Sequence, residues 1–264
     1  MGPRQARTEL LNEIISAKKR EVADLQTRLN VSQVKQLLKG LPRTRGFLKP
    51  NRFSLIAELK KASPSAGLLI ENYQPANLAK AYEEAGAGAL SVLTDSPFFQ
   101  GKIEHLNEAK EATTVPVLRK DFIIDETQIY ESRISGADAV LLIVRILTDG
   151  QLKSFLKLAK ELKLACLVET HSAAEVERAL GCGANFIGIN NRDLDTLKVD
   201  LNTTLKLMGQ FPELKNRLVV SESGIGSAAD VKKLKESGVS GILVGESILR
   251  SRDVSAKIRE LLGG

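Results

Sequence analysis

Short apolar runs alternate with amphipathic helical patterns over most of the chain. Eight runs have the length of strands, and helical patterns with apolar residues three and four positions apart separate them. The strand candidates lie near residues 54–60, 88–93, 115–120, 138–143, 164–169, 186–190, 217–221 and 241–245. The clearest helical patterns cover residues 75–86, 148–163, 172–179, 228–237 and 254–262. This alternation predicts a parallel sheet covered by helices.

Glycine marks the end of several predicted helices. Gly86, Gly136, Gly183 and Gly238 each stand between a helical pattern and the next apolar run, where a left-handed residue commonly ends a helix. Eight β/α units in about 210 residues predict an α/β fold, a (β/α)8 TIM barrel. An open doubly wound sheet is the alternative. It usually has fewer strands, and no Gly-x-Gly-x-x-Gly turn follows the first strand, which disfavours dinucleotide binding.

An extension precedes the predicted barrel. Residues 1–47 are helical in pattern, with an apolar stripe between Leu10 and Leu25 that is interleaved with charged residues, and a second amphipathic segment from Ser32 to Leu38. We expect one domain, in which residues 1–47 pack as a helical cover on a barrel formed by residues 48–264. The pattern leaves open whether the cover only adds stability or acts as a lid over a site.

Composition restricts the class of protein. Of the 264 residues, 43% are hydrophobic and 27% are charged, which is typical of a soluble globular protein. No apolar run approaches the ~20 residues that cross a bilayer, and the start of the chain lacks a signal-peptide core. We therefore expect a cytoplasmic protein, or one of the plastid stroma, without a membrane partner.

The net charge of +6 suits either nucleic acid or a small anionic substrate. The chain has no Trp and three Tyr, and acids are interleaved with its basic residues. Binding of nucleic acid favours stacking aromatic residues or a concentrated basic face. The sequence therefore predicts no nucleic-acid partner, and a solvated surface with a few functional cations.

Cysteine and histidine give no sign of a metal site. Cys166 lies in an apolar run and Cys182 in a Gly-Cys-Gly turn, so neither a disulfide framework nor a metal-ligand spacing is present. We expect both thiols to be inert. His105 and His171 are isolated from each other and are interpreted as surface or loop residues.

Polar residues gather where the apolar runs end. Glu58 and Lys60 end the first run and project to the same side of a strand, while Lys120 ends the third and Glu169 the fifth. In a parallel barrel these ends meet at one face and form the active site. Acids and bases at such positions predict proton transfer, although a structural network of salt bridges at the barrel mouth remains the alternative. Asn190 and Arg192 share a face in strand geometry and would orient a hydroxyl or carboxylate.

The last two predicted strand-to-helix loops favour an anion. Ser221–Ser227 follows the seventh strand and contains Gly224 and Gly226, and Val244–Ser247 follows the eighth. Glycine allows close approach of the backbone, and free amides at a helix N-terminus attract negative charge. TIM barrels frequently bind phosphate at these two loops. The alternative is that the glycines only close tight turns.

Several motifs together resemble one family. They are Ile-Ala-Glu-Leu-Lys-Lys-Ala-Ser-Pro-Ser, Leu-Thr-Asp-Ser-Pro-Phe-Phe-Gln-Gly, Val-Leu-Arg-Lys-Asp-Phe-Ile-Ile-Asp, Leu-Val-Glu-Thr-His, Ile-Gly-Ile-Asn-Asn-Arg-Asp-Leu and Val-Ser-Glu-Ser-Gly-Ile. In this order, with the helical segment around Lys18–Val22, they are similar to the indole-3-glycerol-phosphate synthases over nearly the whole chain. One departure is Ala66, where many relatives carry Lys.

The resemblance implies a cofactor-free and metal-free reaction of tryptophan biosynthesis. The substrate would be 1-(2-carboxyphenylamino)-1-deoxyribulose 5-phosphate, which closes a ring and loses carbon dioxide and water to give indole-3-glycerol phosphate. Besides this small phosphorylated substrate, other tryptophan-pathway enzymes are the partners that the resemblance suggests.

Site residues follow from the same resemblance. Lys120 would be the general acid of ring closure, with Glu58, Lys60 and Glu169 as further acid–base groups. Asn190 and Ser223 would complete the catalytic set, and Arg192 and Glu222 would contact the substrate. The phosphate region would comprise Ser63, Gly224, Gly245, Glu246 and Ser247. For the apolar pocket around the benzene ring the candidates are Phe99, Phe122 and Leu142, for which ordinary core packing is an equal alternative.

Two other functions compete with this one. A phosphosugar barrel similar to phosphoribosylanthranilate isomerase would need a Cys base and an Asp acid at strand ends, whereas the first strand ends in Glu58 and Lys60 and Cys166 comes too early in its strand. A non-catalytic phosphosugar-binding barrel would be expected to lose an acid–base residue, and none is missing here.

Overall fold

The strands close into a barrel. In the computed structural model, which describes residues 3–49 and 52–263, eight parallel strands pair in sequence and the last pairs back with the first. The strands are β1 (Ser54–Leu59), β4 (Ala89–Leu93), β5 (Val117–Lys120), β6 (Ala139–Ile143), β7 (Ala165–Thr170), β8 (Phe186–Asn190), β9 (Leu218–Glu222) and β10 (Gly241–Val244). Each overlaps the run predicted for it. The prediction of a (β/α)8 TIM barrel is confirmed.

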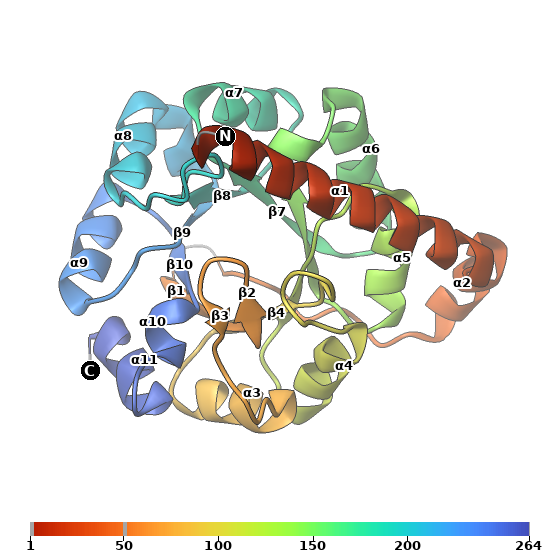
Figure 1. Cartoon of the computed structure of the whole chain (residues 1–264), viewed down its shortest axis with the longest axis horizontal. Helices are drawn as coiled ribbons and strands as arrows, with labels where there is room; N and C mark the ends of the chain where they lie inside the picture. The colour runs from red at the N-terminus through yellow and green to blue at the C-terminus, as the bar shows by residue number, and fades with distance from the viewer. Residues whose placement is uncertain (1–2, 50–51, 264) are drawn as a thin grey trace.

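Helices surround this barrel (Figure 1). They are α3 (Pro75–Glu84), α4 (Ile103–Ala112), α5 (Glu126–Ile134), α6 (Asp149–Glu161), α7 (Ala173–Gly181), α8 (Asn202–Gln210), α9 (Ala228–Ser237), the short α10 (Glu246–Leu249) and α11 (Val254–Leu262), with 3-10 turns η2 (Val144–Ile146) and η3 (Pro212–Asn216). Side chains of Asp125, Thr148, Ser172, Ser227 and Asp253 cap helix N-termini. The predicted left-handed glycines are present, with φ between 82° at Gly136 and 104° at Gly86.

Strand alternation divides the core into two layers. On β1, Leu55, Ala57 and Leu59 point outward into the layer between strands and helices. Ile56 points inward, where it packs with Leu118, Leu167, Val220 and other inner residues of the barrel. The same alternation turns Glu58 inward. Because the strands are parallel, inward residues at their last positions share one end of the barrel.

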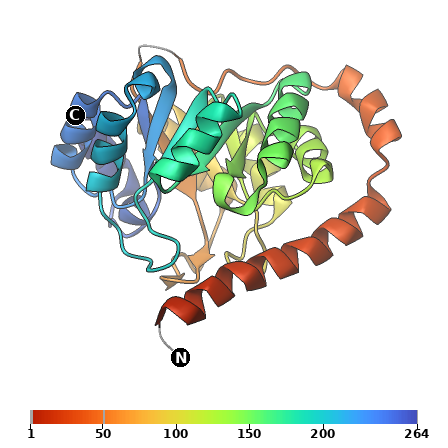
Figure 2. The ribbon, with the colours of Figure 1, turned by 90° about the horizontal axis from the view of Figure 1, so that it is seen from above.

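The N-terminal extension spans both ends of the barrel. Helix α1 (Pro3–Arg28) crosses the face where the strands end, α2 (Val31–Leu37) and the 3-10 turn η1 (Leu38–Gly40) lie at the side, and residues 41–49 return along the opposite face (Figures 1 and 2). The helical pattern predicted for residues 1–47 therefore ends at Gly40. Beyond it, Phe47 enters the inner layer at the amino end of the barrel, where its ring centroid lies 5.7 Å from that of Phe186 and the two rings are tilted by 44°.

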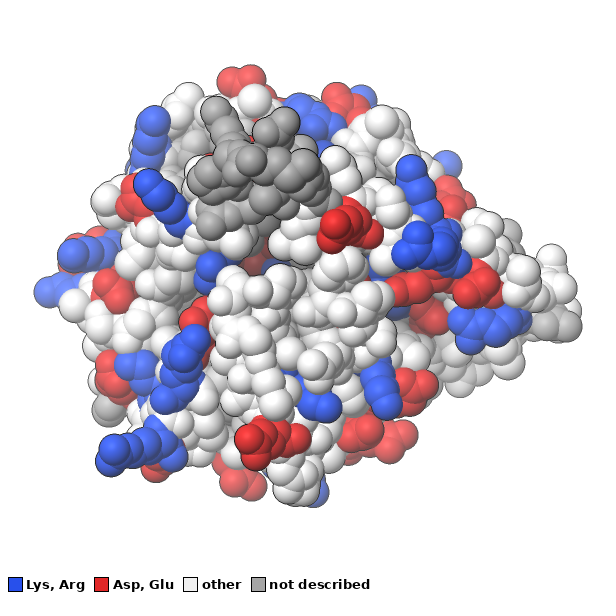
Figure 3. Space-filling view, in the orientation of Figure 1, with Lys and Arg blue, Asp and Glu red and all other residues white. Residues whose placement is uncertain are grey.

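A short hairpin stands over the same face as α1. Strands β2 (Ala62–Ser63) and β3 (Gly67–Leu68) pair antiparallel in the loop between β1 and α3. Around the rim of this face, the basic and acidic side chains of the described residues are interspersed (Figure 3). Across the described residues, no helix has the length and apolar character that crossing a membrane requires.

Candidate active site

A cavity of about 560 Å³ opens at the carboxyl ends of the strands. All eight barrel strands contribute to its wall, and α1 adds Leu10, Leu11 and Ile14. This face is the one at which TIM barrels carry their sites. The cavity brings together all but one of the residues that the sequence analysis singled out as site residues: Glu58, Lys60, Ser63, Phe99, Lys120, Phe122, Glu169, Asn190, Arg192, Glu222, Ser223, Gly224, Gly245, Glu246 and Ser247.

Lys120 lies between two carboxylates at the base of the cavity. Its Nζ is 2.9 Å from Glu169 Oε2 and 3.0 Å from Glu222 Oε2, and both carboxylates are almost fully buried. Burial disfavours the ammonium, but the charges of Glu169 and Glu222 outweigh it and raise the pKa of Lys120 above its usual range. Lys120 is therefore protonated near neutral pH.

The two carboxylates differ in their surroundings. Burial favours the neutral acid at both. At Glu169, Lys120 and His171 reverse this effect and hold the pKa well below its usual range. At Glu222, Lys120 offsets burial only in part, and burial together with the charge of Glu169 raises the pKa to about 7. Glu222 Oε1 has no hydrogen-bond partner among the described residues. The site thus holds one carboxylate that stays ionised and one that titrates near neutrality.

A second acid–base pair faces the cavity from β1. Lys60 Nζ lies 2.5 Å from Glu58 Oε2, and the side chains are 14% and 7% exposed. As predicted from strand alternation, the two residues project to the same side. Gly245 of the neighbouring strand end lies directly against the Glu58 carboxylate, and a Cβ there would also meet Glu58 Cβ at 3.0 Å. The absence of a side chain at Gly245 therefore makes room for Glu58, a role beyond the phosphate contact predicted for it.

The loops after β9 and β10 form a joined wall. Ser247 Oγ donates to the Ile225 carbonyl at 2.7 Å, which ties the two loops together. Ser223 and Gly224 are both left-handed, with φ of 68° and 79°, and such a conformation at a non-glycine residue often marks a functional site. Helix α10 begins at Glu246, where first-turn amides lack intrahelical partners. These amides and the glycine backbone suit an anion.

Arg192 and Glu246 stand at the rim near these loops. Arg192 Nη2 lies 3.4 Å from Glu246 Oε2, and Arg250 Nε lies 2.9 Å from Glu246 Oε1. The Glu246 carboxylate is thus held by two guanidinium groups, and its backbone is the part that suits an anion. Arg192 lies in the loop after β8, which ends at Asn190, so the two residues do not share a face of one strand. Both nevertheless line the cavity, because the loop turns Arg192 toward it. There Asn190 Oδ1 accepts a 3.0 Å hydrogen bond from the Arg192 amide.

The apolar wall corrects one prediction. Phe99 and Phe122 line the cavity with ring centroids 6.2 Å apart. Leu142, predicted beside them, is fully buried in the outer layer between strands and helices and does not line the cavity. Its neighbours Leu141 and Ile143 do. The prediction of Leu142 is wrong by one strand position, which places a side chain on the opposite face of the sheet.

His171 was missed as a site residue. It lies in the loop after β7, as expected, but its side chain is 5% exposed and is not at the surface. The imidazole lies between Glu169 and Glu175. The available signal was its place two residues after a strand-terminal Glu, with a second Glu four residues later. His105, interpreted in the same way, lies on α4 and is partly buried edge-on against Tyr73.

Asn191 was also missed. Its side-chain amide donates to Ser221 Oγ, the Glu222 carbonyl and the Ser223 carbonyl at 2.9–3.1 Å. Its Oδ1 accepts from the backbone and hydroxyl of Thr204 on α8. Asn191 thereby holds the end of β9 in the conformation that presents Glu222 and Ser223. No periodicity distinguished it from its neighbour Asn190.

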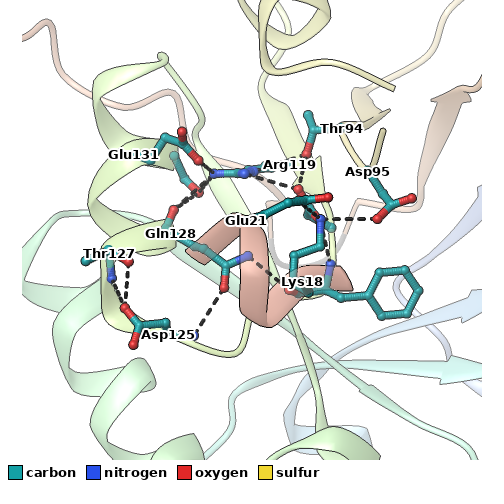
Figure 4. Close-up of polar contacts among 12 residues, drawn as sticks. Lys18, Glu21, Thr94, Asp95, Arg119, Asp125, Thr127, Gln128 and Glu131 are labelled. Carbon is teal, nitrogen blue, oxygen red and sulfur yellow. Dashed lines mark hydrogen bonds and ion pairs between the residues drawn. The ribbon is translucent and has the colours of Figure 1, made fainter. Parts of the chain in front are cut away.

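Buried charges anchor α1 beside the cavity. Lys18 Nζ lies 3.1 Å from Asp95 Oδ2 and 2.8 Å from Asp121 Oδ1, with each side chain at most 2% exposed (Figure 4). Burial opposes the Lys18 charge, but Asp121 and Asp95 outweigh it and raise its pKa above the usual range. Burial likewise opposes ionisation of Asp121, yet Arg119 and Lys18 lower its pKa to about 2. Since Asp121 follows Lys120, the anchor adjoins the catalytic candidates.

The Cys166 thiol lies on β7, and the residue is partly buried. Burial raises the pKa of Cys166 to about 12, so this thiol stays protonated near neutrality. Within residues 3–49 and 52–263, no group of three or more His, Cys, Asp or Glu side chains is arranged to hold a metal ion.

Comparison with known proteins matches almost the whole chain. A family model described as indole-3-glycerol phosphate synthase matches residues 11–261. Curated proteins of that name from Acetivibrio thermocellus, Desulforamulus reducens and Neisseria gonorrhoeae are 48%, 45% and 44% identical; the alignments cover 95–96% of this chain and 97–99% of those proteins. Among solved structures, thiamine phosphate pyrophosphorylase from Pyrococcus furiosus aligns with a TM-score of 0.58 over 81% of this chain and 95% of that one. At 16% identity it supports the fold alone.

Proposed function

Because the chain belongs to the indole-3-glycerol phosphate synthase family, we propose that it converts 1-(2-carboxyphenylamino)-1-deoxyribulose 5-phosphate into indole-3-glycerol phosphate. The reaction forms one carbon–carbon bond and releases one carbon dioxide and one water, which makes the enzyme a carboxy-lyase. The observation that carries the proposal is the position of Lys120, which is held protonated between Glu169 and Glu222 inside a cavity with an apolar wall.

Lys120 is the general acid of ring closure. When the aromatic carbon attacks the ribulose carbonyl carbon, negative charge develops on the carbonyl oxygen. An ammonium in a buried site stabilises that charge and donates its proton, which turns the oxygen into a hydroxyl. The raised pKa of Lys120 keeps the proton available near neutral pH.

Glu169 is the base of the same set. It stays ionised between Lys120 and His171, so it can accept a proton in a later step or return Lys120 to its protonated form. Loss of carbon dioxide then restores the aromatic ring, which Phe99 and Phe122 contact in the apolar wall.

Glu58 and Lys60 form the second set. Departure of the hydroxyl as water needs a proton donor at that oxygen and a base for the proton lost in forming the new double bond. Lys60 and Glu58 lie 2.5 Å apart on the same wall and meet both needs. Asn190 and Arg192 orient the substrate hydroxyl groups from the end of β8.

The phosphate occupies the joined wall made by the loops after β9 and β10. Gly224, Gly245, Glu246 and Ser247 supply backbone amides there, and Ser63 closes the wall from the β2–β3 hairpin. The cavity thus has an anion-binding side and an apolar side, as a phosphosugar joined to a benzoate ring requires.

The proposal is tested by adding the substrate to the purified protein without metal or cofactor and following indole fluorescence and released carbon dioxide. We expect both to rise, with one carbon dioxide for each indole product. Conversion of the substrate without indole fluorescence or released carbon dioxide would indicate an isomerase similar to phosphoribosylanthranilate isomerase. Bound substrate without any product would indicate a non-catalytic phosphosugar-binding barrel. Either result would overturn the proposal.

A further inference from the structure

A histidine lies directly behind the Glu169 carboxylate, on the side away from the cavity. His171 Nε2 is 3.3 Å from Glu169 Oε1, and Nδ1 is 3.1 Å from Glu175 Oε2. The Glu175 carboxylate also accepts a 2.8 Å hydrogen bond from the His171 backbone amide. The imidazole is therefore held by a hydrogen bond at Nδ1 and by one at its own backbone amide, whereas Nε2 lies within ion-pair distance of Glu169 without forming a hydrogen bond to a described residue. It touches the catalytic carboxylate but does not line the cavity.

His171 and Glu169 belong to a row of five charged groups whose signs alternate. From the first turn of α7 into the cavity they are Glu175, His171, Glu169, Lys120 and Glu222. Arg145 on η2 is close enough to Glu175 for their charges to interact, and its Nη2 forms an ion pair with Asp195 Oδ1 at 2.6 Å. Burial opposes the His171 charge, but Glu169 and Glu175 outweigh it and raise its pKa to about 9. His171 is therefore a cation near neutral pH.

The two carboxylates beside Lys120 have different numbers of cationic neighbours. Glu169 has a cation at each oxygen, Lys120 at Oε2 and His171 at Oε1. Glu222 has Lys120 at Oε2 and no partner at Oε1 among the described residues. Without His171, two buried carboxylates would share one ammonium almost symmetrically, and a proton entering the site would be divided between them. The His171 charge favours the ionised form of Glu169, whereas burial and the charge of Glu169 favour the protonated form of Glu222.

We propose, resting on the function above, that His171 is a positioning residue: it fixes the Glu169 carboxylate from behind and assigns the exchangeable proton of the Lys120 site to Glu222. A histidine that only packs the loop would not require a carboxylate at each ring nitrogen. Glu175 on α7 holds the imidazole in this position through hydrogen bonds to Nδ1 and to the His171 backbone amide.

The first test is a titration that does not involve the reaction. The chain has two histidines, so ring resonances of the full-length protein can be assigned with the single variant His105→Gln. We expect His171 to titrate near pH 9 and His105 below its ordinary pKa, because burial lowers the latter. Glu175→Gln should lower the pKa of His171. A His171 pKa at or below its ordinary value would overturn the proposal.

The second test separates position from charge. His171→Gln retains an N–H that can reach Glu169 but cannot be protonated, whereas His171→Ala removes both features. We expect kcat to fall about tenfold or more in His171→Ala, as for other residues that orient a catalytic group, and to recover largely in His171→Gln. His105→Gln is the matched control and should leave kcat unchanged.

The pH dependence of kcat/KM distinguishes this role from a structural one. Loss of the His171 cation makes the site more negative, so the site binds its exchangeable proton more tightly. In both His171 variants the midpoint assigned to Glu222, near pH 7 in the wild type, should move upward by about one pH unit. Unmoved midpoints in folded variants would overturn the proposal. An inactive wild type with the expected His171 titration would instead refute the proposed function alone.

Discussion

Two positions without a side chain control where the buried carboxylates lie. Gly188 on β8 lies against Glu222 Oε1 and near Leu167, and Gly245 lies against Glu58. Neither glycine is left-handed, so the constraint at each is space and not backbone conformation. Each glycine thus leaves the space that its neighbouring carboxylate occupies.

We predict that Gly188→Ala lowers kcat by about 10²-fold, because its Cβ overlaps the observed position of Glu222 and moves the carboxylate away from Lys120. The effect is measured by steady-state kinetics on protein with native circular dichroism. Gly181→Ala is the control, since an added Cβ at this last residue of α7 has nothing within 4 Å and should leave kcat unchanged. Equal kcat values for the two variants would contradict the claim that Gly188 makes room for the Glu222 carboxylate.

We predict that Gly245→Ala lowers kcat as well as raising KM. A residue that only contacts phosphate would change KM alone, whereas the Cβ at this position also displaces Glu58. Separate determination of kcat and KM decides between them. An unchanged kcat would restrict Gly245 to the phosphate contact.

Single residues set the limit of what the sequence could predict. Glu58, Lys60, Lys120 and Glu169 were recognisable because an unpaired charge at the end of an apolar strand is costly to bury and therefore indicates a site or an ion pair. Leu142 and Leu141 could not be separated, since both are apolar and only the strand phase distinguishes their faces. The partners of His171 depend on how the β7–α7 loop turns, which no periodicity encodes.

At the scale of elements, α1 is held over the cavity by charge as well as by apolar packing. Its apolar stripe contains Ile14, Val22 and Leu25, all buried as predicted. Lys18 is buried as well, although the helical pattern placed it among the polar residues. A buried lysine is tolerated only when carboxylates meet it, and these come from the distant strand ends that carry Asp95 and Asp121. That pairing is long-range and therefore invisible to a periodicity analysis.

We predict that Lys18→Met lowers the free energy of unfolding by about 3 kcal/mol, because Asp95 is left buried without its cation while Asp121 retains Arg119. We also expect a higher KM, since α1 contributes Leu10, Leu11 and Ile14 to the cavity. Urea denaturation and steady-state kinetics measure both effects. Lys19→Met, an exposed neighbour, is the control. Equal free energies of unfolding for the two variants would contradict the claim that the buried ion pairs of Lys18 hold α1 on the barrel.

At the scale of the whole molecule, the barrel concentrates function at one end and closure at the other. Phe47 and Arg45 tie the returning extension to the amino end, where Arg45 donates to the Val115 and Lys110 carbonyls. The strand ends on the opposite face carry the acids, bases and anion-binding loops. This division was predictable, because eight repeated β/α units dictate a closed barrel and a closed parallel barrel dictates which ends converge.

We predict that inorganic phosphate stabilises the molecule and inhibits it competitively. Phosphate binds the native loops after β9 and β10 but not the unfolded chain, so a concentration 100 times its Kd should add about 2.7 kcal/mol of stability. Thermal unfolding in phosphate, against chloride at equal ionic strength, measures the effect. Equal Tm values in the two salts, without inhibition, would contradict the assignment of the anion site.

The central claim is that Lys120 gives a proton to the substrate, and the most direct measurement compares Lys120→Met and Lys120→Arg with the control Lys157→Met on α6. Arginine can retain the pairing with Glu169 and Glu222 but does not release a proton at accessible pH. We predict that both Lys120 variants bind substrate, measured by calorimetry, and lose about 10²–10⁴ in kcat, whereas Lys157→Met keeps wild-type kcat. A Lys120→Arg variant with near wild-type kcat would contradict proton donation by Lys120.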